Sequence, residues 1–423
     1  MSFREWWSWF ADLHWSLKWF PLLVALRPVV DNFYFLKEIS PFLSPLYIVG
    51  VLTPVLSITA LFYFKMPSFS KTDKAFFYWS LALILSCVML LFYDPFSLLS
   101  IEFVLKLSLP VYLYFFLRVF ITDLRDLHGI LQSFLYAGIF VAIILLYEVL
   151  VNPIRIEESR GLDRIQGNFG DVVSYGMYIV FTFIVASYFF LSRQHILSLS
   201  KRLWLLVPVS ILGLIGLFNI HHTATYSIFV LLVGTFLTFN LRSKNQPVAI
   251  AIVIIAVFVT SYWGNQIISE NIEPLLETDL AVYSGEQSSD KLLHGRVGRW
   301  RMMLQLFSAE SVAVQFLGFP LTFDYVYHFV GIGSHNDFIR ILFATGILGL
   351  VLYLNFISKI FSRASDLGVA QRYLVYSVLF ALILYSVSVT PTFYAPFMYF
   401  ALTVFAFLAL DEKEMIRWKD HEY

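Results

Sequence analysis

Apolar runs of about 20 residues recur along this chain, and they constrain its fold more than any other feature. A run of that length crosses the hydrocarbon core as one helix, because a helix satisfies its own backbone hydrogen bonds where there is no water. The pattern predicts an all-α polytopic membrane protein with about twelve transmembrane helices. The runs cover roughly residues 19–35, 46–64, 75–93, 99–121, 127–150, 171–191, 203–219, 224–240, 248–263, 335–358, 373–390 and 394–410.

The composition agrees with a membrane protein and excludes several other classes. Of the 423 residues, 59% are hydrophobic and 14% are charged, whereas soluble proteins carry about 25% charged residues. The formal net charge is zero, which gives no case for binding nucleic acid. The single cysteine, Cys87, lies in an apolar run, so neither an intrachain disulfide nor a cysteine-based metal site is available.

The placement of Lys and Arg in the predicted loops indicates the orientation. If the spans alternate, the cation-rich loops all fall on one side, and we expect that side and both termini to be cytoplasmic. The aromatic-rich segment 1–20 is expected to lie at the membrane interface, and the long loops 151–170 and 264–334 to be external. The cytoplasmic cations are Lys65, Lys71, Lys74, Arg125, Arg193, Lys201, Arg202, Arg242, Lys244, Lys359, Arg363, Arg372, Lys413, Arg417 and Lys419.

The segment 264–334 is too long to be a plain connector. We expect one membrane domain, residues 1–423, with this segment as a large external loop between the ninth and tenth spans. Its first half is acidic and its second half is basic and aromatic. Such a loop suits a lid over a site for anions. A solvated loop with interfacial aromatic residues is the alternative.

Candidate chemistry gathers around the end of this loop. Arg296 and Arg299 are three residues apart in a predicted helix, so they share a face and could clasp a phosphate or pyrophosphate. His335 stands where the next span begins, at the boundary with water, and could act as a general base on a hydroxyl. In the alternative interpretation, the arginines bind lipid phosphate and the histidine only forms hydrogen bonds at the helix start.

Other polar residues allow more than one interpretation. Arg160 and Arg164 lie in the other long external loop. His221 and His222 follow each other in a short external turn, but adjacent histidines point apart and no carboxylate is close in sequence, which disfavours a metal site. Within the spans, the spacing favours ion pairs on one helix face for Arg27 with Asp31 and for Glu102 with Lys106. Arg340, one turn inside the tenth span, is a candidate to face the same cavity as His335.

The pair His335-Asn336, followed after nine residues by Gly346-x-x-Gly349, resembles the motif of the O-antigen ligase and O-antigen polymerase (Wzy-type) superfamily of membrane glycosyltransferases. Further segments resemble elements of that family in the same order along most of the chain, and the N-terminal ones are similar to those of exopolysaccharide polymerases. They are Arg27-Pro28-Val29-Val30-Asp31, Ser44-Pro45-Leu46, Gly50-Val51-Leu52-Thr53-Pro54, Arg164-Ile165-Gln166-Gly167-Asn168-Phe169, Gly295-Arg296, Trp300 and Leu317-Gly318.

The resemblance implies a GT-C-like enzyme of the bacterial inner membrane, with its active site on the periplasmic face. It implies transfer of a glycan from undecaprenyl pyrophosphate to a sugar hydroxyl without metal or other cofactor, and it allows for a chain-length regulator as a protein partner. His335 matches the catalytic histidine of the family, and Arg296 matches the arginine of its large loop. The residues expected to bind substrate or pyrophosphate are Arg164, Arg299, Arg340, Asn336, His222 and Trp300.

One position departs from the family pattern. Ligases of the family carry another arginine near the outer start of the eighth span, where this chain has no arginine between His221 and Ser227. His222, Arg164 or Arg340 could take over its role. We therefore expect a polymerase that joins lipid-linked repeat units of an O-antigen, capsule or exopolysaccharide. The alternatives are a ligase that transfers glycan to lipid A-core or protein, and a transporter of lipid-linked sugars. No inverted repeat is visible, and the ionisable residues gather at the external face, which disfavours a transporter.

Overall fold

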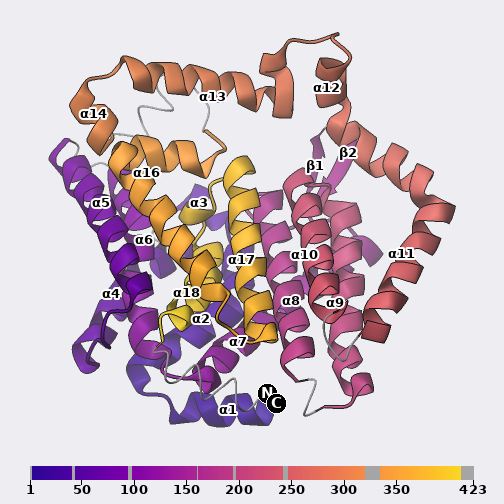
Figure 1. Cartoon of the computed structure of the whole chain (residues 1–423), viewed down its shortest axis with the longest axis horizontal. Helices are drawn as coiled ribbons and strands as arrows, with labels where there is room; N and C mark the ends of the chain where they lie inside the picture. Colours follow the sequence, from indigo (N-terminus) through magenta and orange to yellow (C-terminus); the bar gives the residue numbers. More distant parts are fainter. Residues whose placement is uncertain are drawn as a thin grey trace.

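The computed structural model describes residues 2–40, 43–93, 98–159, 161–193, 197–241, 246–319 and 334–410. Long helices run between two ends of the molecule (Figure 1). Within these ranges, nine helices are long and apolar enough to cross a membrane. The chain is therefore an all-α, multi-pass membrane protein, as the apolar runs predicted.

Every predicted span lies on a helix of the structure, with boundaries shifted by a few residues. The helices of the bundle are α2 (Trp15–Asn32), α4 (Pro45–Tyr63), α5 (Lys71–Tyr93), α6 (Leu98–Phe120), α7 (Leu124–Leu150), α8 (Val172–Ser192), α9 (Leu199–Ile220), α10 (Thr223–Leu241), α11 (Gln246–Ile267), α16 (Asp337–Ala364), α17 (Val369–Ser388) and α18 (Ala395–Leu408). Short elements join them: α1 (Phe3–Asp12), α3 (Leu36–Ile39) and η4 (Pro391–Phe393).

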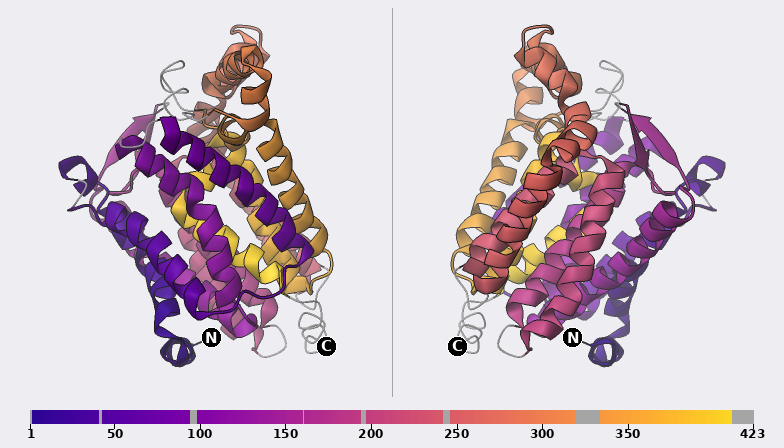
Figure 2. Two further views of the ribbon diagram at one scale, coloured as in Figure 1. Left: turned by 90° about the vertical axis from the view of Figure 1, so that its left-hand side faces the viewer. Right: turned by 90° about the vertical axis from the view of Figure 1, so that its right-hand side faces the viewer.

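The segment predicted as a large loop is mostly helical. It contains η2 (Ile268–Ile272), α12 (Glu273–Tyr283), η3 (Ser289–Lys291), α13 (Leu292–Ala309) and α14 (Val312–Leu317). These elements project beyond one end of the bundle, where α13 crosses above α16 (Figures 1 and 2). The hairpin of β1 (Ile156–Ser159) and β2 (Leu162–Ile165) lies at the same end, with Glu157 paired opposite Arg164.

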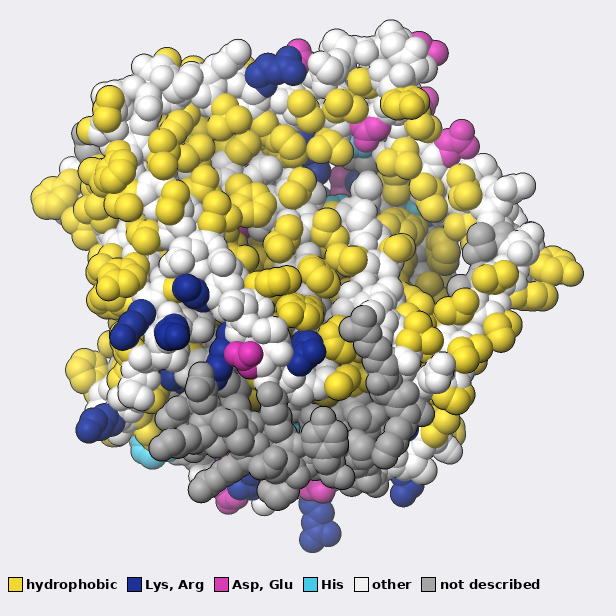
Figure 3. All heavy atoms as spheres, viewed as in Figure 1, with side chains coloured by type: hydrophobic (Ala, Val, Ile, Leu, Met, Phe, Trp, Pro, Cys, Tyr) yellow, Lys and Arg dark blue, Asp and Glu magenta, His cyan; other side chains and the backbone are white. Residues whose placement is uncertain are grey.

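The end that carries α12–α14, β1, β2 and the first turns of α10 and α16 is called the loop face below, and the opposite end is called the α1 face. Helix α1 caps the α1 face, where the indole nitrogen of Trp6 donates to the carbonyl of Gly129 at 3.0 Å. A buried ion pair joins Arg118 to Asp73 at 2.8 Å, and Arg118 also donates to the carbonyl of Ala409. Lys and Arg side chains gather toward this end (Figure 3), as the alternation of the predicted loops requires.

Helix α8 is the centre of the bundle and α4 lies at its edge. In the most apolar window of α8, 89% of the residues are buried, compared with 17% in α4. Small residues allow close contact: a Cβ on Gly176 would overlap the side chain of Thr225. A helix that is apolar on all sides is expected at such a central position.

The ion pairs predicted within the spans are confirmed. Arg27 donates to Asp31 at 2.8 Å, and the hydroxyl of Tyr178 donates to the second oxygen of Asp31 at 2.5 Å. Lys106 lies 2.6 Å from Glu102. Pairing compensates the cost of placing these charges among apolar helices, so both pairs serve the packing of the bundle.

Candidate functional site

The start of α16 fixes the backbone around His335. The side-chain oxygen of Asn336 accepts from the backbone nitrogen of Ile339 at 3.1 Å and caps the helix. Ser334, just before His335, is buried, and its hydroxyl donates to the carbonyl of Asn336, just after His335, at 3.0 Å. The resemblance implies that Asn336 binds substrate, and this stays a prediction; in the structure its side-chain oxygen caps α16.

His335 has a left-handed backbone, with a φ of 46°. Such a conformation costs a residue with a Cβ about 1 kcal/mol. The residue is exposed, and it forms no hydrogen bond or ion pair with any described residue. The caps on either side therefore hold the imidazole in a position where a ligand can reach it.

Helix α13 lies over His335 and is anchored to α16. The indole nitrogen of Trp300 donates to the carbonyl of Ser334 at 2.8 Å. One face of α13 packs on the first turns of α16 through an apolar cluster of Met303, Phe307, Phe319, Ile339 and Phe343. These contacts fix the register between α13 and the histidine. Trp300 thus positions α13, a role that the sequence did not reveal.

Arg296 and Arg299 lie at the beginning of the regular part of α13. Three left-handed residues precede them, ending with Gly295 at φ 78°. The turn is held to α12, because a ring nitrogen of His294 contacts the carbonyl of Leu275 at 3.0 Å. Burial and the neighbouring Arg299 lower the pKa of Arg296, and Asp279 opposes them. Arg296 has no hydrogen bond or ion pair within the described ranges, so its guanidinium remains available to an anion.

The arginines and His335 form one electrostatic cluster. Partial burial lowers the pKa of His335 from 6.5, and Arg296, Arg299 and Arg340 lower it further, while Asp171 raises it. The imidazole is consequently neutral near pH 7, which is the form that accepts a proton. The structure therefore brings together four residues that the sequence selected. They are Arg296 and Arg299 of α13, His335 just before α16, and Arg340 of α16.

Arg340 and two acidic residues form the floor of this cluster. Arg340 stacks on the ring of Phe393 at 3.7 Å and donates to the hydroxyl of Thr390 at 3.3 Å. Asp337 is buried and accepts from the hydroxyl and the backbone nitrogen of Thr392. Both contacts tie α16 to η4.

Asp171 joins the floor from α8. Its side chain caps α8 by accepting from the backbone nitrogen of Ser174 at 2.7 Å, and it also accepts from the hydroxyl of Tyr394. Asp171 and Asp337 were not among the residues predicted to form the site. Both precede or begin an apolar run, which is a typical capping position and could have drawn attention to them.

Two glycines from different segments of the family resemblance, Gly346 and Gly318, lie where α14 meets α16. Gly346 adopts φ 66° and ψ −172°, a region that essentially only glycine occupies, and it kinks α16. A Cβ there would overlap the carbonyl of Phe316. Gly318, also left-handed, lies against Ala344, and the backbone nitrogen of Phe319 donates to the carbonyl of Phe343 at 2.7 Å. Thus Gly346 and Gly318 allow α14 to pack backbone to backbone on α16.

The remaining predicted residues lie elsewhere on the loop face. Arg164 lies beside His221, whose pKa it lowers together with burial. A ring nitrogen of His222 contacts the hydroxyl of Thr225 at 2.8 Å, and this hydroxyl lies 3.3 Å from that of Tyr385. Arg160 is outside the described residues. So are Tyr325, Tyr327 and His328, which precede His335 in the sequence.

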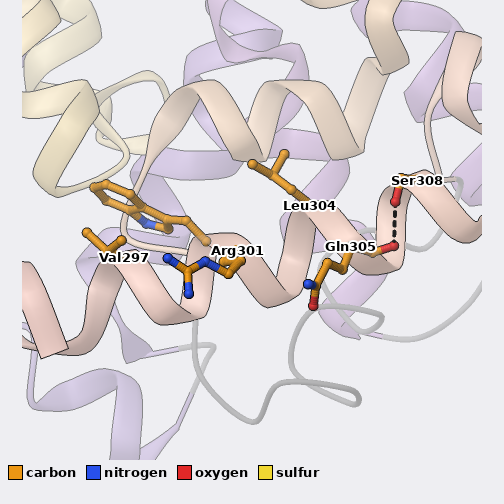
Figure 4. A pocket seen from close by; sticks show the side chains of 6 residues that line it. Val297, Arg301, Leu304, Gln305 and Ser308 are labelled. Carbon is orange, nitrogen blue, oxygen red and sulfur yellow. Dashed lines mark hydrogen bonds between the residues drawn. The ribbon is translucent and has the colours of Figure 1, made fainter. Parts of the chain in front are cut away.

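A hollow opens in the surface below α13, and cationic, acidic and histidine side chains are visible inside it behind an apolar rim (Figure 3). A separate pocket of about 550 Å³ borders α13 (Figure 4). Its charged member Arg301 is paired with Asp290 at 2.6 Å, whereas Arg296 has no ion pair with a described residue. The residues that line this pocket are Val297, Trp300, Arg301, Leu304, Gln305 and Ser308.

Comparison with protein-family models and with curated proteins finds no match for this sequence. Among the described residues, no group of three or more His, Cys, Asp or Glu side chains is arranged to hold a metal ion. Since a fold alone does not specify an activity, the function is inferred from the chemistry of the site.

Proposed function

We propose that this chain is a membrane glycosyltransferase that polymerises lipid-linked repeat units of a surface polysaccharide. The observation that carries the proposal is the placement of an exposed, neutral imidazole among three arginines at the mouth of a membrane helix. The donor is a glycan on undecaprenyl pyrophosphate, and the acceptor is a sugar hydroxyl of the next repeat unit. The resemblance of the sequence to the O-antigen polymerase group adds support that is independent of the geometry.

The site contains groups suited to each part of this reaction. His335 takes the proton from the acceptor hydroxyl as its oxygen bonds to the anomeric carbon of the donor. The bond between that carbon and the pyrophosphate oxygen breaks, and the pyrophosphate leaves with the electron pair. Arg296 and Arg299 bind the leaving group and compensate its charge. Arg340 keeps the floor of the site cationic.

The proposal includes the setting of the protein. The fold is of the GT-C type, and the chain lies in the bacterial inner membrane with the loop face on the periplasmic side. Both termini are cytoplasmic. The gathering of Lys and Arg on the α1 face supports this orientation, because cytoplasmic loops of membrane proteins are enriched in these residues.

The test uses purified protein in liposomes with a lipid-linked repeat unit as the only substrate. The expected product is a ladder of chain lengths, and Arg296→Gln and His335→Gln should each abolish it. Arg301→Gln is the matched control on α13, because Arg301 is exposed and paired with Asp290. Transfer that appears only after addition of lipid A-core would instead establish a ligase. A normal ladder from the His335 variant would exclude the proposed base.

A further inference from the structure

The segment around η4, residues 390–394, is called the strap below, and it is tied to two helices at once. The hydroxyl and the backbone nitrogen of Thr392 donate to Asp337 of α16 at 2.7 Å and 3.2 Å. The hydroxyl of Tyr394 donates to Asp171 at the start of α8. Phe393 stands between these two residues of the strap, so its backbone is fixed from both sides.

The ring of Phe393 supports the guanidinium of Arg340. The guanidinium lies over this ring, with 3.7 Å between its central carbon and the ring centroid. Phe103 of α6 contacts both groups, because its ring stacks on Phe393 at 5.5 Å and its centroid is 5.3 Å from the same carbon. The Nη1 atom of Arg340 donates to the hydroxyl of Thr390 at 3.3 Å. Residues from α6, α16 and the strap thus meet around one guanidinium.

These contacts orient Arg340 without compensating its charge. By contrast, the buried Arg27 and Arg118 are each held by an aspartate. A carboxylate compensates the charge of its arginine, whereas an aromatic ring and a hydroxyl carry no formal charge. Stacking covers only the face of a guanidinium, because its N–H groups lie in the plane. The rings therefore fix the orientation of Arg340 and leave its charge to act on the site.

The charge of Arg340 acts on His335, which lies just before α16. Together with burial and the other arginines it lowers the pKa of the imidazole. The charged groups that act on this ring are Arg296 and Arg299 of α13, Arg340 of α16 and Asp171 at the start of α8. We propose that Phe393 and Phe103 are positioning residues of the site: they hold the guanidinium of Arg340 in the floor, and through it they fix the charge that His335 and a bound anion meet. The part in catalysis rests on the proposed function, and the positioning of Arg340 does not.

The titration of the His335 ring tests the positioning without turnover. Histidine-labelled protein in an uncharged detergent is followed by NMR, and the His335 signal is assigned by its absence in His335→Gln. Arg340→Gln should raise the pKa of His335 by about 0.5, because it removes a nearby cation. Phe393→Leu should raise this pKa by a smaller amount, because leucine fills the space but does not hold a guanidinium by its face. Phe393→Tyr keeps the aromatic face and should retain the wild-type pKa.

A double-mutant cycle shows whether the ring acts through Arg340. In an Arg340→Gln background, Phe393→Leu should cause no further change in the pKa of His335, because the group that it positions is gone. An equal change in that background would overturn the proposal, and so would an unchanged pKa in Phe393→Leu alone. Phe338→Leu is the matched control: it removes a ring from the first turn of α16 that packs with Tyr353 at 6.4 Å, and the pKa should stay unchanged.

If Phe393→Leu does not fold, Thr390→Val takes its place. It removes the hydroxyl that accepts from Arg340 and should also raise the pKa of His335, and an unchanged pKa would then overturn the proposal.

Initial rates of polymerisation measure the part in catalysis. Phe393→Leu should lower kcat about five- to tenfold and leave KM within about twofold, because a displaced cation stabilises the charge of the transition state less well. An unchanged kcat would overturn this part. The predicted changes in the His335 titration without any polymer from the wild-type protein would contradict the proposed function and support the positioning of Arg340.

Discussion

Two histidines on the loop face share a backbone geometry but differ in exposure. His221 and His335 each stand two residues before a membrane helix, with φ values of 47° and 46°. Burial and arginines lower the pKa of both. However, His335 is exposed among three arginines, whereas His221 is buried beside one. Residue type and place in the sequence therefore do not separate the two histidines, but exposure does, and under the proposed function only the ring of His335 can reach a large acceptor.

The comparison is tested most directly by the same substitution at both histidines. We expect His335→Gln to lower polymerisation by about 100- to 10,000-fold, because it removes a general base. His221→Gln should stay within about tenfold of wild type, because a buried ring cannot reach an acceptor sugar. Initial rates with purified protein at equal concentration measure both. Equal losses would show that the exposure of the two rings does not separate their roles.

The second prediction concerns the backbone contact between α14 and α16. This contact lies near His335 and not near His221. Gly346→Ala should destabilise the protein by about 3 kcal/mol, because alanine disfavours the left-handed backbone and its Cβ overlaps the carbonyl of Phe316. Polymerisation should fall with it. Thermal unfolding in detergent measures the change. Gly234→Ala, in an open position of α10, is the control and should be neutral or slightly stabilising.

The sequence predicted the helices well because each apolar run encodes its own helix, and nine of the helices in the described ranges are long and apolar enough to cross a membrane. It also placed Arg296, Arg299, His335 and Arg340 near one another, since a loop and the helix that follows it are joined in the chain. These are local relations. Because successive spans alternate in direction, counting them was enough to predict that the two long loops lie on the same side. This prediction required no information about how the helices pack.

Contacts across distant segments could not be predicted in this way. The hydrogen bond from Tyr394 to Asp171 joins residues 223 positions apart, and the approach of Arg164 to His221 depends on how the hairpin folds back on α9. The left-handed backbone of both histidines is set by caps and tertiary contacts, because this conformation is uncommon for any residue other than glycine. Helical periodicity contains none of this information.

The third prediction uses the charges around His335. A general base works only when unprotonated, so activity should rise with pH through the pKa of His335, which lies below 6.5. Arg299→Gln removes a cation that disfavours protonation, so this pKa should rise and the acid limb of the profile should move to higher pH. The rate at the optimum should fall only about tenfold, because Arg296 remains.

The pH profile of polymerisation measures this shift, with Arg301→Gln as the control on the same helix. An acid limb that stays in place in Arg299→Gln would mean that another group sets it. The titration of His221 should be the same in both variants, because burial and Arg164 set it.

The smallest expected effect separates backbone strain from side-chain packing at the two histidines. Glycine relieves a left-handed backbone by about 1 kcal/mol. His335→Gly should therefore stabilise the protein slightly while abolishing activity, because the exposed ring makes no hydrogen bond with the described residues. His221→Gly gains the same relief but loses a buried ring, which costs about 2 kcal/mol, so it should destabilise. Thermal unfolding of both variants in one detergent gives the signs. Stabilisation at position 221 would mean that its unpartnered ring costs more than its packing contributes.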